Sequence, residues 1–275
     1  MATLLDKLFA RNVATCVYGL AAIAIGLVGL AWGDFLAVWQ PVPKSLPGRT
    51  ALAYAVAVVF LLAGAGLQLK RSAGAGALIL TLLYSVGVLL LHVPLVIAHP
   101  SVFVMWSGTA EQLALVAGGM MTYSFCISTV PQAAEPNPQA DRMATIARLI
   151  FGVCLIFFAL AHLFYLKPTA DLVPVWLPPG QAFWAYATAA GHFAAGIAIL
   201  FKVAAQLAAR LLTAMFIVFS LAVHIPLVIA DPHMHFNWAA NTMNFALIGS
   251  AWTIAASFRQ TRRPAASALK KPIAA

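Results

Sequence analysis

The chain has 275 residues, of which 63% are hydrophobic and only 8% are charged. Soluble domains carry roughly 25% charged residues, so this chain lacks the polar side chains that a water-facing surface needs. The net charge of +9 comes from Lys and Arg residues that stand mostly singly or in pairs at the ends of apolar runs. Because no continuous basic face forms, a nucleic-acid partner is not expected. Composition therefore predicts an integral membrane protein surrounded by the lipid bilayer.

Eight apolar stretches have the length of about 20 residues that a membrane-spanning helix needs. They cover residues 11–32, 51–69, 74–98, 105–128, 145–166, 181–201, 206–230 and 237–258. Residues 129–144 are rich in Pro, Ala and polar side chains and are predicted to form a cytoplasmic linker, and 259–275 a basic, disordered tail. The sequence thus predicts an all-α membrane fold of about eight transmembrane helices, with one four-helix unit in 1–128 and another in 145–258.

The two units resemble each other at two constant offsets. Residues 92–100 read HVPLVIAHP and residues 224–232 read HIPLVIADP, seven of nine identical at an offset of 132. Nearer the start of each unit the offset is 137, which pairs Arg11 with Arg148 and Trp39 with Trp176. Two collinear offsets with such matches predict a tandem duplication, in which the second copy is five residues shorter between its first two helices.

The distribution of basic residues predicts the orientation. The termini and the even-numbered connections hold 13 of the 16 Lys and Arg residues, and the other three are Lys44, Arg49 and Lys167. Basic residues concentrate on the cytoplasmic side of membrane proteins. Both termini are therefore expected in the cytoplasm of an inner-membrane protein. Since each unit has an even number of helices, the two copies are expected to be parallel repeats.

Polar side chains gather in the outer halves of the predicted helices. His92 and Glu111 each lie about six residues from the outer end of neighbouring helices, roughly 9 Å deep at 1.5 Å per residue. The same reasoning brings His224 level with Asn244, and His192 lies nearer mid-membrane. An isolated carboxylate is costly in a membrane, so Glu111 needs a partner, and His92 is the candidate. The pair could handle protons or form a structural hydrogen bond, and both interpretations stay open.

His92 and His224 also stand two residues before a proline, Pro94 or Pro226. Proline removes a backbone donor from a helix, so histidines that stabilise a kink are an alternative interpretation. Two histidines at equal depth also suggest a bis-histidine haem. No CxxCH attachment motif accompanies them, so the sequence does not favour haem.

The loop after the seventh predicted helix holds a further group of polar side chains. Asp231, His233 and His235 combine a carboxylate with two alternating imidazoles, which are ligand types for zinc or copper. The corresponding first-unit residues, 99–103, read HPSVF, so this group is not part of the repeat. A solvated polar turn is the alternative.

Residues 171–179 read DLVPVWLPP and are followed by Phe183-Trp-Ala-Tyr186 and a helix containing Gly191 and Gly196. In these residues the chain resembles the DoxX-like family, and residues 34–41, DFLAVWQP, repeat the pattern more loosely. Members of that family are typically single four-helix units. The resemblance implies one of two roles. Some relatives are membrane subunits associated with quinone-linked oxidation, including thiosulfate:quinone oxidoreductases, and others are accessory proteins in redox or metal homeostasis. The family supplies no catalytic residues.

The resemblance favours a membrane subunit or accessory protein of quinone-linked redox chemistry, with a redox enzyme as partner and a quinone as ligand. One alternative is a small-molecule or metal-ion carrier with a polar cavity between the repeats, lined by Glu111, His92, His192 and His224. The other is a non-catalytic assembly or chaperone-like protein in which these residues only pack. The sequence identifies neither a substrate nor an oligomeric state.

Overall fold

The structure, a computed structural model, describes residues 4–128 and 137–258, which form helices and contain no strand. The prediction of an all-α fold is confirmed. The first half contains α1 (Leu4–Leu8), α2 (Arg11–Trp32), the 3₁₀ turn η1 (Ala37–Trp39), α3 (Arg49–Gly66), α4 (Ala73–Gly87), the π turn η2 (Val88–His92), α5 (Val93–Ala98) and α6 (Phe103–Ile127). The second half contains α7 (Pro138–Phe164), α8 (Leu166–Asp171), α9 (Gln181–Phe201), α10 (Ala205–Phe219), the π turn η3 (Ser220–His224), α11 (Ile225–Ala230) and α12 (His235–Ser257).

Six helices in the described residues are long and apolar enough to cross a membrane. They are α2, α3, the continuous segment Ala73–Ala98, α7, α9 and the continuous segment Ala205–Ala230. The predicted helices at 105–128 and 237–258 are present as α6 and α12, but these two do not belong to that set. Their role as the seventh and eighth membrane spans stays a prediction.

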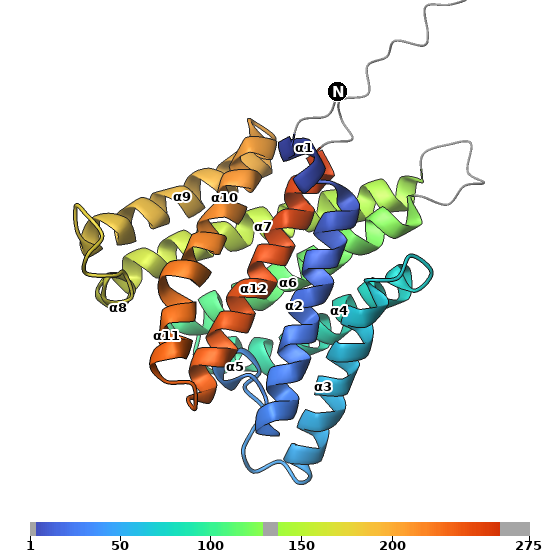
Figure 1. The fold of residues 1–275 in the computed structure, drawn as a ribbon, viewed down its shortest axis with the longest axis horizontal. Helices are drawn as coiled ribbons and strands as arrows, with labels where there is room; N and C mark the ends of the chain where they lie inside the picture. Colours follow the sequence, from blue (N-terminus) through green and yellow to red (C-terminus); the bar gives the residue numbers. More distant parts are fainter. Residues whose placement is uncertain (1–3, 129–136, 259–275) are drawn as a thin grey trace, which may run out of the picture.

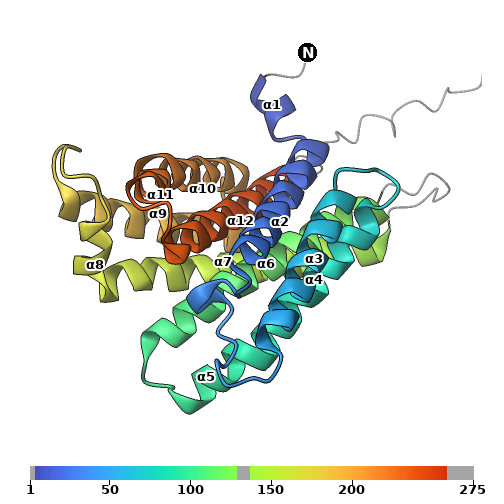
Figure 2. The same ribbon diagram turned by 60° about the horizontal axis from the view of Figure 1, so that its bottom comes forward.

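Helices α6 and α12 occupy the middle of the molecule. Helix α6 packs against α4, α7 and α12, and α12 packs against α2, α10 and α6. Figures 1 and 2 show α3 and α4 on one side of this centre and α9 and α10 on the other. Most of α12 is buried, including Asn244, Ser250 and Thr253. Because protein surrounds α6 and α12, they can hold polar side chains that a lipid-facing helix would not tolerate.

Glycines allow α2, α6 and α12 to approach one another closely. A Cβ on Gly249 of α12 would lie 2.8 Å from the Cα of Tyr18 in α2, and a Cβ on Gly118 of α6 would clash with the Ser250 hydroxyl. The hydroxyl of Tyr18 donates to the backbone carbonyl of Leu115 at 2.7 Å. Small residues at helix crossings are typical of membrane proteins, where close packing drives helix association. These residues hold the two halves together.

A π turn precedes the proline in each half. The amide of Val93 donates to the carbonyl of Val88, and the amide of Ile225 donates to that of Ser220. In lipid every backbone group needs a partner inside the protein, and a π turn is one way to accommodate the amide that proline removes. His92 and His224 end these turns, so each histidine stands at a local change of helix type, and its role in stabilising a kink stays a prediction.

Residues 132 apart occupy matching buried positions in the two halves. The rings of Phe60 and Tyr84 lie 5.4 Å apart, and those of His192 and Phe216, at the same offset, lie 5.6 Å apart. Thr81 and Thr213 are both buried, and each donates to the carbonyl four residues earlier. These correspondences favour the tandem duplication, which stays a prediction.

Helix α7 begins earlier than expected. Residues 138–144 were predicted to belong to the linker, but they form the first two turns of α7. The side chain of Asn137 accepts hydrogen bonds from the amides of Gln139 and Ala140, and Pro138 stands at the first helical position. Both features favour a helix start. The rest of the predicted linker, 129–136, and the predicted tail, 259–275, lie outside the described residues.

The close approach at Gly249 makes a testable prediction. In Gly249→Ala the added methyl group meets the backbone of Tyr18, which cannot move aside cheaply. Overpacking of this kind costs about 1–3 kcal/mol. We expect a lower melting temperature in mild detergent, measured by intrinsic fluorescence. The control is Gly87→Ala, because a Cβ there has no atom within 4 Å. Equal melting temperatures for the two variants would contradict the prediction.

Candidate functional site

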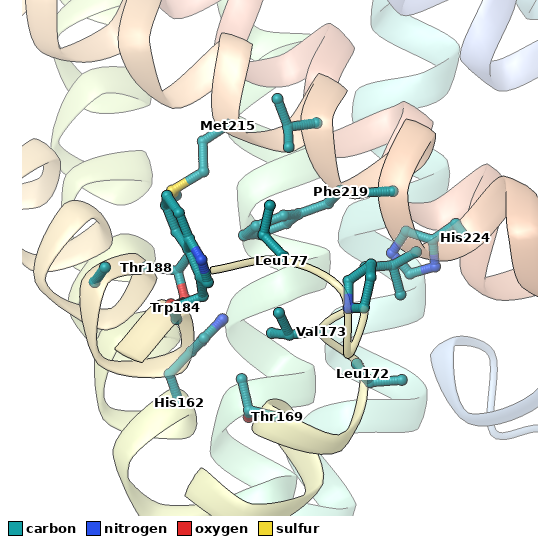
Figure 3. A pocket seen from close by; sticks show the side chains of 15 residues that line it. His162, Thr169, Leu172, Val173, Leu177, Trp184, Thr188, Met215, Phe219 and His224 are labelled. Carbon is teal, nitrogen blue, oxygen red and sulfur yellow. Dashed lines mark hydrogen bonds between the residues drawn. The ribbon is translucent and has the colours of Figure 1, made fainter. Parts of the chain in front are cut away.

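A cavity of about 410 Å³ lies in the second half, among α7, α8, α9, α10 and η3. Its walls are mainly apolar and aromatic, with a few polar side chains (Figure 3). It is lined by His162, Thr169, Leu172, Val173, Pro174, Leu177, Trp184, Ala187, Thr188, Met215, Val218, Phe219, Ala222, Val223 and His224. Apolar cavities with a few placed polar groups are typical of sites for small organic ligands.

The chain after α8 forms one wall of this cavity. Leu172, Val173 and Leu177 come from this segment. Trp184, at the start of α9, donates its indole N–H to the carbonyl of Pro178 at 2.9 Å. Because this N–H is already bonded, Trp184 offers the cavity an aromatic surface and no free donor.

His162 contributes a hydrogen-bond acceptor. Its Nδ1 lies 2.9 Å from the carbonyl of Phe158. Since a carbonyl only accepts, the neutral ring carries its proton on Nδ1, and Nε2 is left as an acceptor. Figure 3 shows the imidazole pointing into the cavity.

The predicted site residue His192 lies behind His162 and does not line the cavity. The two rings are 4.8 Å apart, and the side chain of His192 is 1% exposed. Its Nδ1 lies 2.9 Å from the carbonyl of Thr188, one turn earlier in α9. His192 therefore helps to position His162 by packing against it.

His224 lies on another wall of the cavity (Figure 3). Its Nδ1 is buried and has no hydrogen-bond partner among the described residues. A buried polar atom without a partner costs stability, roughly 1–3 kcal/mol. Because this nitrogen is itself buried, a ligand in the cavity could bond it only after the imidazole ring rotates.

The predicted pair in the first half is joined through a third residue. Glu111 accepts a hydrogen bond from the indole N–H of Trp39, and Nε2 of His92 lies 3.1 Å from the carbonyl of the same tryptophan. No hydrogen bond or ion pair between His92 and Glu111 is found in the described part of the chain. The expected direct contact is thus replaced by a bridge. Depth in the membrane does not determine helix rotation, and the two side chains converge on Trp39 instead.

Trp39 and Trp176, its counterpart at an offset of 137, differ in position. Trp39 is half-buried and also stacks on Phe236 of α12, with ring centroids 5.5 Å apart. Trp176 is 73% exposed. In the first half the chain itself occupies the place beside His92, whereas in the second half His224 faces a cavity.

Among the described contacts, no hydrogen bond joins Asn244 to His224 either. The side-chain amide of Asn244 donates to the carbonyl of Phe216 at 2.9 Å and to the hydroxyl of Ser220 at 2.7 Å. Asn244 therefore supports the backbone just before the π turn. Its counterpart Gln112 instead lies 3.7 Å from the sulfur of Met243.

The loop residues proposed as metal ligands do not converge. Among the described residues no three His, Cys, Asp or Glu side chains lie close enough to hold a metal ion. Asp231 accepts from the backbone amide of His233 at 3.2 Å, and His235 stacks on Trp32 with ring centroids 5.3 Å apart. Burial lowers the pKa of His235, and the carboxylate of Asp34 opposes this shift. The polar-turn interpretation agrees better with this arrangement.

The comparisons with known proteins identify one segment. Residues 143–225 match the family model described as DoxX. This segment is DoxX-like. The resemblance predicted from residues 171–196 is confirmed, and it supports a multi-pass membrane protein. No curated protein and no solved structure matches the chain. The complete lining of the cavity, from His162 to His224, lies inside the DoxX segment.

The Trp39 bridge makes a second prediction. Trp39→Phe keeps an aromatic side chain but removes the indole N–H that donates to Glu111, so the carboxyl group of Glu111 loses its hydrogen-bond donor. We expect destabilisation of about 1–3 kcal/mol, measured as a lower melting temperature in detergent. Glu111→Gln keeps an acceptor and should have a smaller effect. Trp176→Phe is the control, because that ring is exposed. An unchanged melting temperature in Trp39→Phe would remove the bridge as a stabilising contact.

Proposed function

We propose that the protein is a membrane subunit or accessory protein in quinone-linked redox chemistry, and that the cavity in its DoxX segment binds the quinone ring. The observation that carries this proposal is the position of the cavity. All its lining residues belong to the segment that matches DoxX. DoxX-like membrane proteins include partners of quinone-linked enzymes, by the resemblance described above.

The chemistry of the lining supports a quinone. The carbonyl oxygens of a quinone accept hydrogen bonds, and the hydroxyls of a quinol donate them. His162 offers an acceptor at Nε2, and the unpartnered ring of His224 can donate in one of its neutral tautomers. Trp184, Met215 and Phe219 also line the cavity, and their side chains suit an apolar ring.

Binding of a short-chain ubiquinone to the protein in lipid nanodiscs tests the proposal. We expect saturable quenching of tryptophan fluorescence, with roughly tenfold weaker binding in His162→Phe and in His224→Phe. That factor corresponds to the loss of one hydrogen bond of about 1.4 kcal/mol. His99→Phe is the matched control, because His99 is exposed and does not line the cavity.

Equal affinities in all three variants would contradict the assigned site. Absence of saturable binding to the wild-type protein would contradict the proposal that the protein binds a quinone. Stable co-purification with an oxidoreductase would support the subunit role, as tested by mass spectrometry of the native complex.

The carrier alternative has less support. Its four proposed lining residues lie in different places: His92 and Glu111 at Trp39, His192 behind the cavity wall, and only His224 in the wall. Saturable flux of a small molecule into proteoliposomes would still favour it over the quinone proposal.

The predicted orientation is part of the proposal. The concentration of 13 of 16 basic residues at the termini and even-numbered connections supports cytoplasmic termini in the inner membrane. With eight spanning helices, a reporter fused after residue 260 should be active only in a form that works in the cytoplasm. Activity of a reporter that works only in the periplasm would show that the predicted orientation is wrong.

A further inference from the structure

A second cavity lies near the other end of α7, and it has the opposite character. It encloses about 250 Å³ and is lined largely by polar side chains. The start of α2, the end of α6, the first turns of α7 and the end of α12 surround it. Arg148 in this cavity and His162 in the first one are 14 residues apart in α7, or about 21 Å at 1.5 Å per residue. The two sites are therefore separate.

Two arginines, one from each half, face this second cavity. Arg11 begins α2, and Arg148, its counterpart at an offset of 137, lies in α7. The guanidinium of Arg11 lies over the ring of Phe125 at 4.6 Å from its centroid, and that of Arg148 over the ring of Phe258 at 5.3 Å. Cation–π contacts of this kind hold guanidinium groups in place, so both charges are positioned before any ligand arrives.

Both arginines have N–H groups that are not used in hydrogen bonds among the described residues. Nη1 of Arg11 donates to the hydroxyl of Ser128 at 3.0 Å. Nε of Arg148 is buried and has no hydrogen-bond partner in the described part of the chain. A guanidinium has five N–H donors in a fixed fork that fits the oxygens of a phosphate.

Ser124, Ser257 and Asp141, which also line the cavity, have no free hydrogen-bond donor for a phosphate. The hydroxyls of Ser124 and Ser257 each donate to a carbonyl three residues earlier, both at 2.7 Å. Asp141 is exposed at the cavity and attracts both arginines, although no ion pair joins it to either of them among the described contacts. Donors therefore come from the arginines, and the lining keeps a net positive charge.

We infer that this cavity binds a phosphate group through Arg11 and Arg148. Two sources share this chemistry: the headgroup of an anionic phospholipid and free inorganic phosphate. The position at helix ends, on the side where basic residues concentrate in the sequence, is where a lipid headgroup would meet the protein. Basic pockets between helices on the cytoplasmic side bind such headgroups in other membrane proteins. The inference does not depend on the quinone proposal.

The test uses the full chain in a neutral detergent. Phosphatidylglycerol in mixed micelles and inorganic phosphate are titrated separately, and the melting temperature is followed. We expect saturable stabilisation of the wild-type protein and at least tenfold weaker binding in Arg148→Gln. Arg142→Gln is the matched control, because Arg142 is exposed on the same helix and does not line the cavity. Its affinity should change less than twofold.

Asp141→Asn gives a change in the opposite direction. It removes the carboxylate that lines the cavity, so an anion should bind several-fold more tightly. Asp141 is exposed, and the variant is expected to fold even if Arg148→Gln does not. Weaker or unchanged binding in Asp141→Asn would overturn the inference, as would equal losses in Arg142→Gln and Arg148→Gln.

The two titrations distinguish the sources. Saturation by phosphatidylglycerol that millimolar inorganic phosphate does not displace supports a lipid headgroup. Saturable stabilisation by inorganic phosphate that is weakened at least tenfold in Arg148→Gln supports free phosphate. Stabilisation by neither probe overturns the site.

Discussion

The arrangement of the whole molecule depends on the close packing of α2, α6 and α12 around Tyr18. Gly118 and Gly249 leave no room for a side chain at this crossing. The last helix of the second half, α12, can therefore lie against α2, the first long helix of the first half, and α6 packs in turn against α7. The two inner helices are shielded by the outer ones and carry Gln112, Asn244 and several hydroxyl side chains. The outer helices present apolar surface, as a lipid environment requires.

The need to satisfy backbone groups accounts for the positions of His92 and His224. Each histidine ends a π turn that adapts the helix to a following proline. The backbone thus brings the two imidazoles to corresponding places for structural reasons. What they contact there differs: His92 bonds the chain at Trp39, while His224 borders a cavity. The π turn therefore sets the position of each imidazole. Whether a ligand can reach the imidazole depends on the connection after the first helix of that half, which in the first half places Trp39 beside His92.

Much of the fold could be predicted from composition and hydrophobic length, since the apolar stretches and the proline motifs coincide with observed helices. The site could be predicted only in part. Equal depth brought His92 and Glu111 near one tryptophan, but depth does not determine helix rotation, and no sequence pattern indicates that Trp39 lies between them. His162, Trp184 and Met215 come from three helices whose relative rotation depends on packing. The start of α7 did have a local signal, Asn137 followed by Pro138, which the composition of the surrounding segment obscured.

The different positions of Trp39 and Trp176 have a consequence for stoichiometry. A duplicated chain with two equivalent sites would bind two ligands, and the sites could influence each other. Here the first half uses its own tryptophan where the second half leaves a cavity. Under the proposed function, titration with quinone to saturation should therefore give one quinone per chain, with a hyperbolic isotherm. In the proposed binding, Trp39 fills this position in the first half, and among the described residues the cavity that would exchange a quinone with the bilayer lies in the second half.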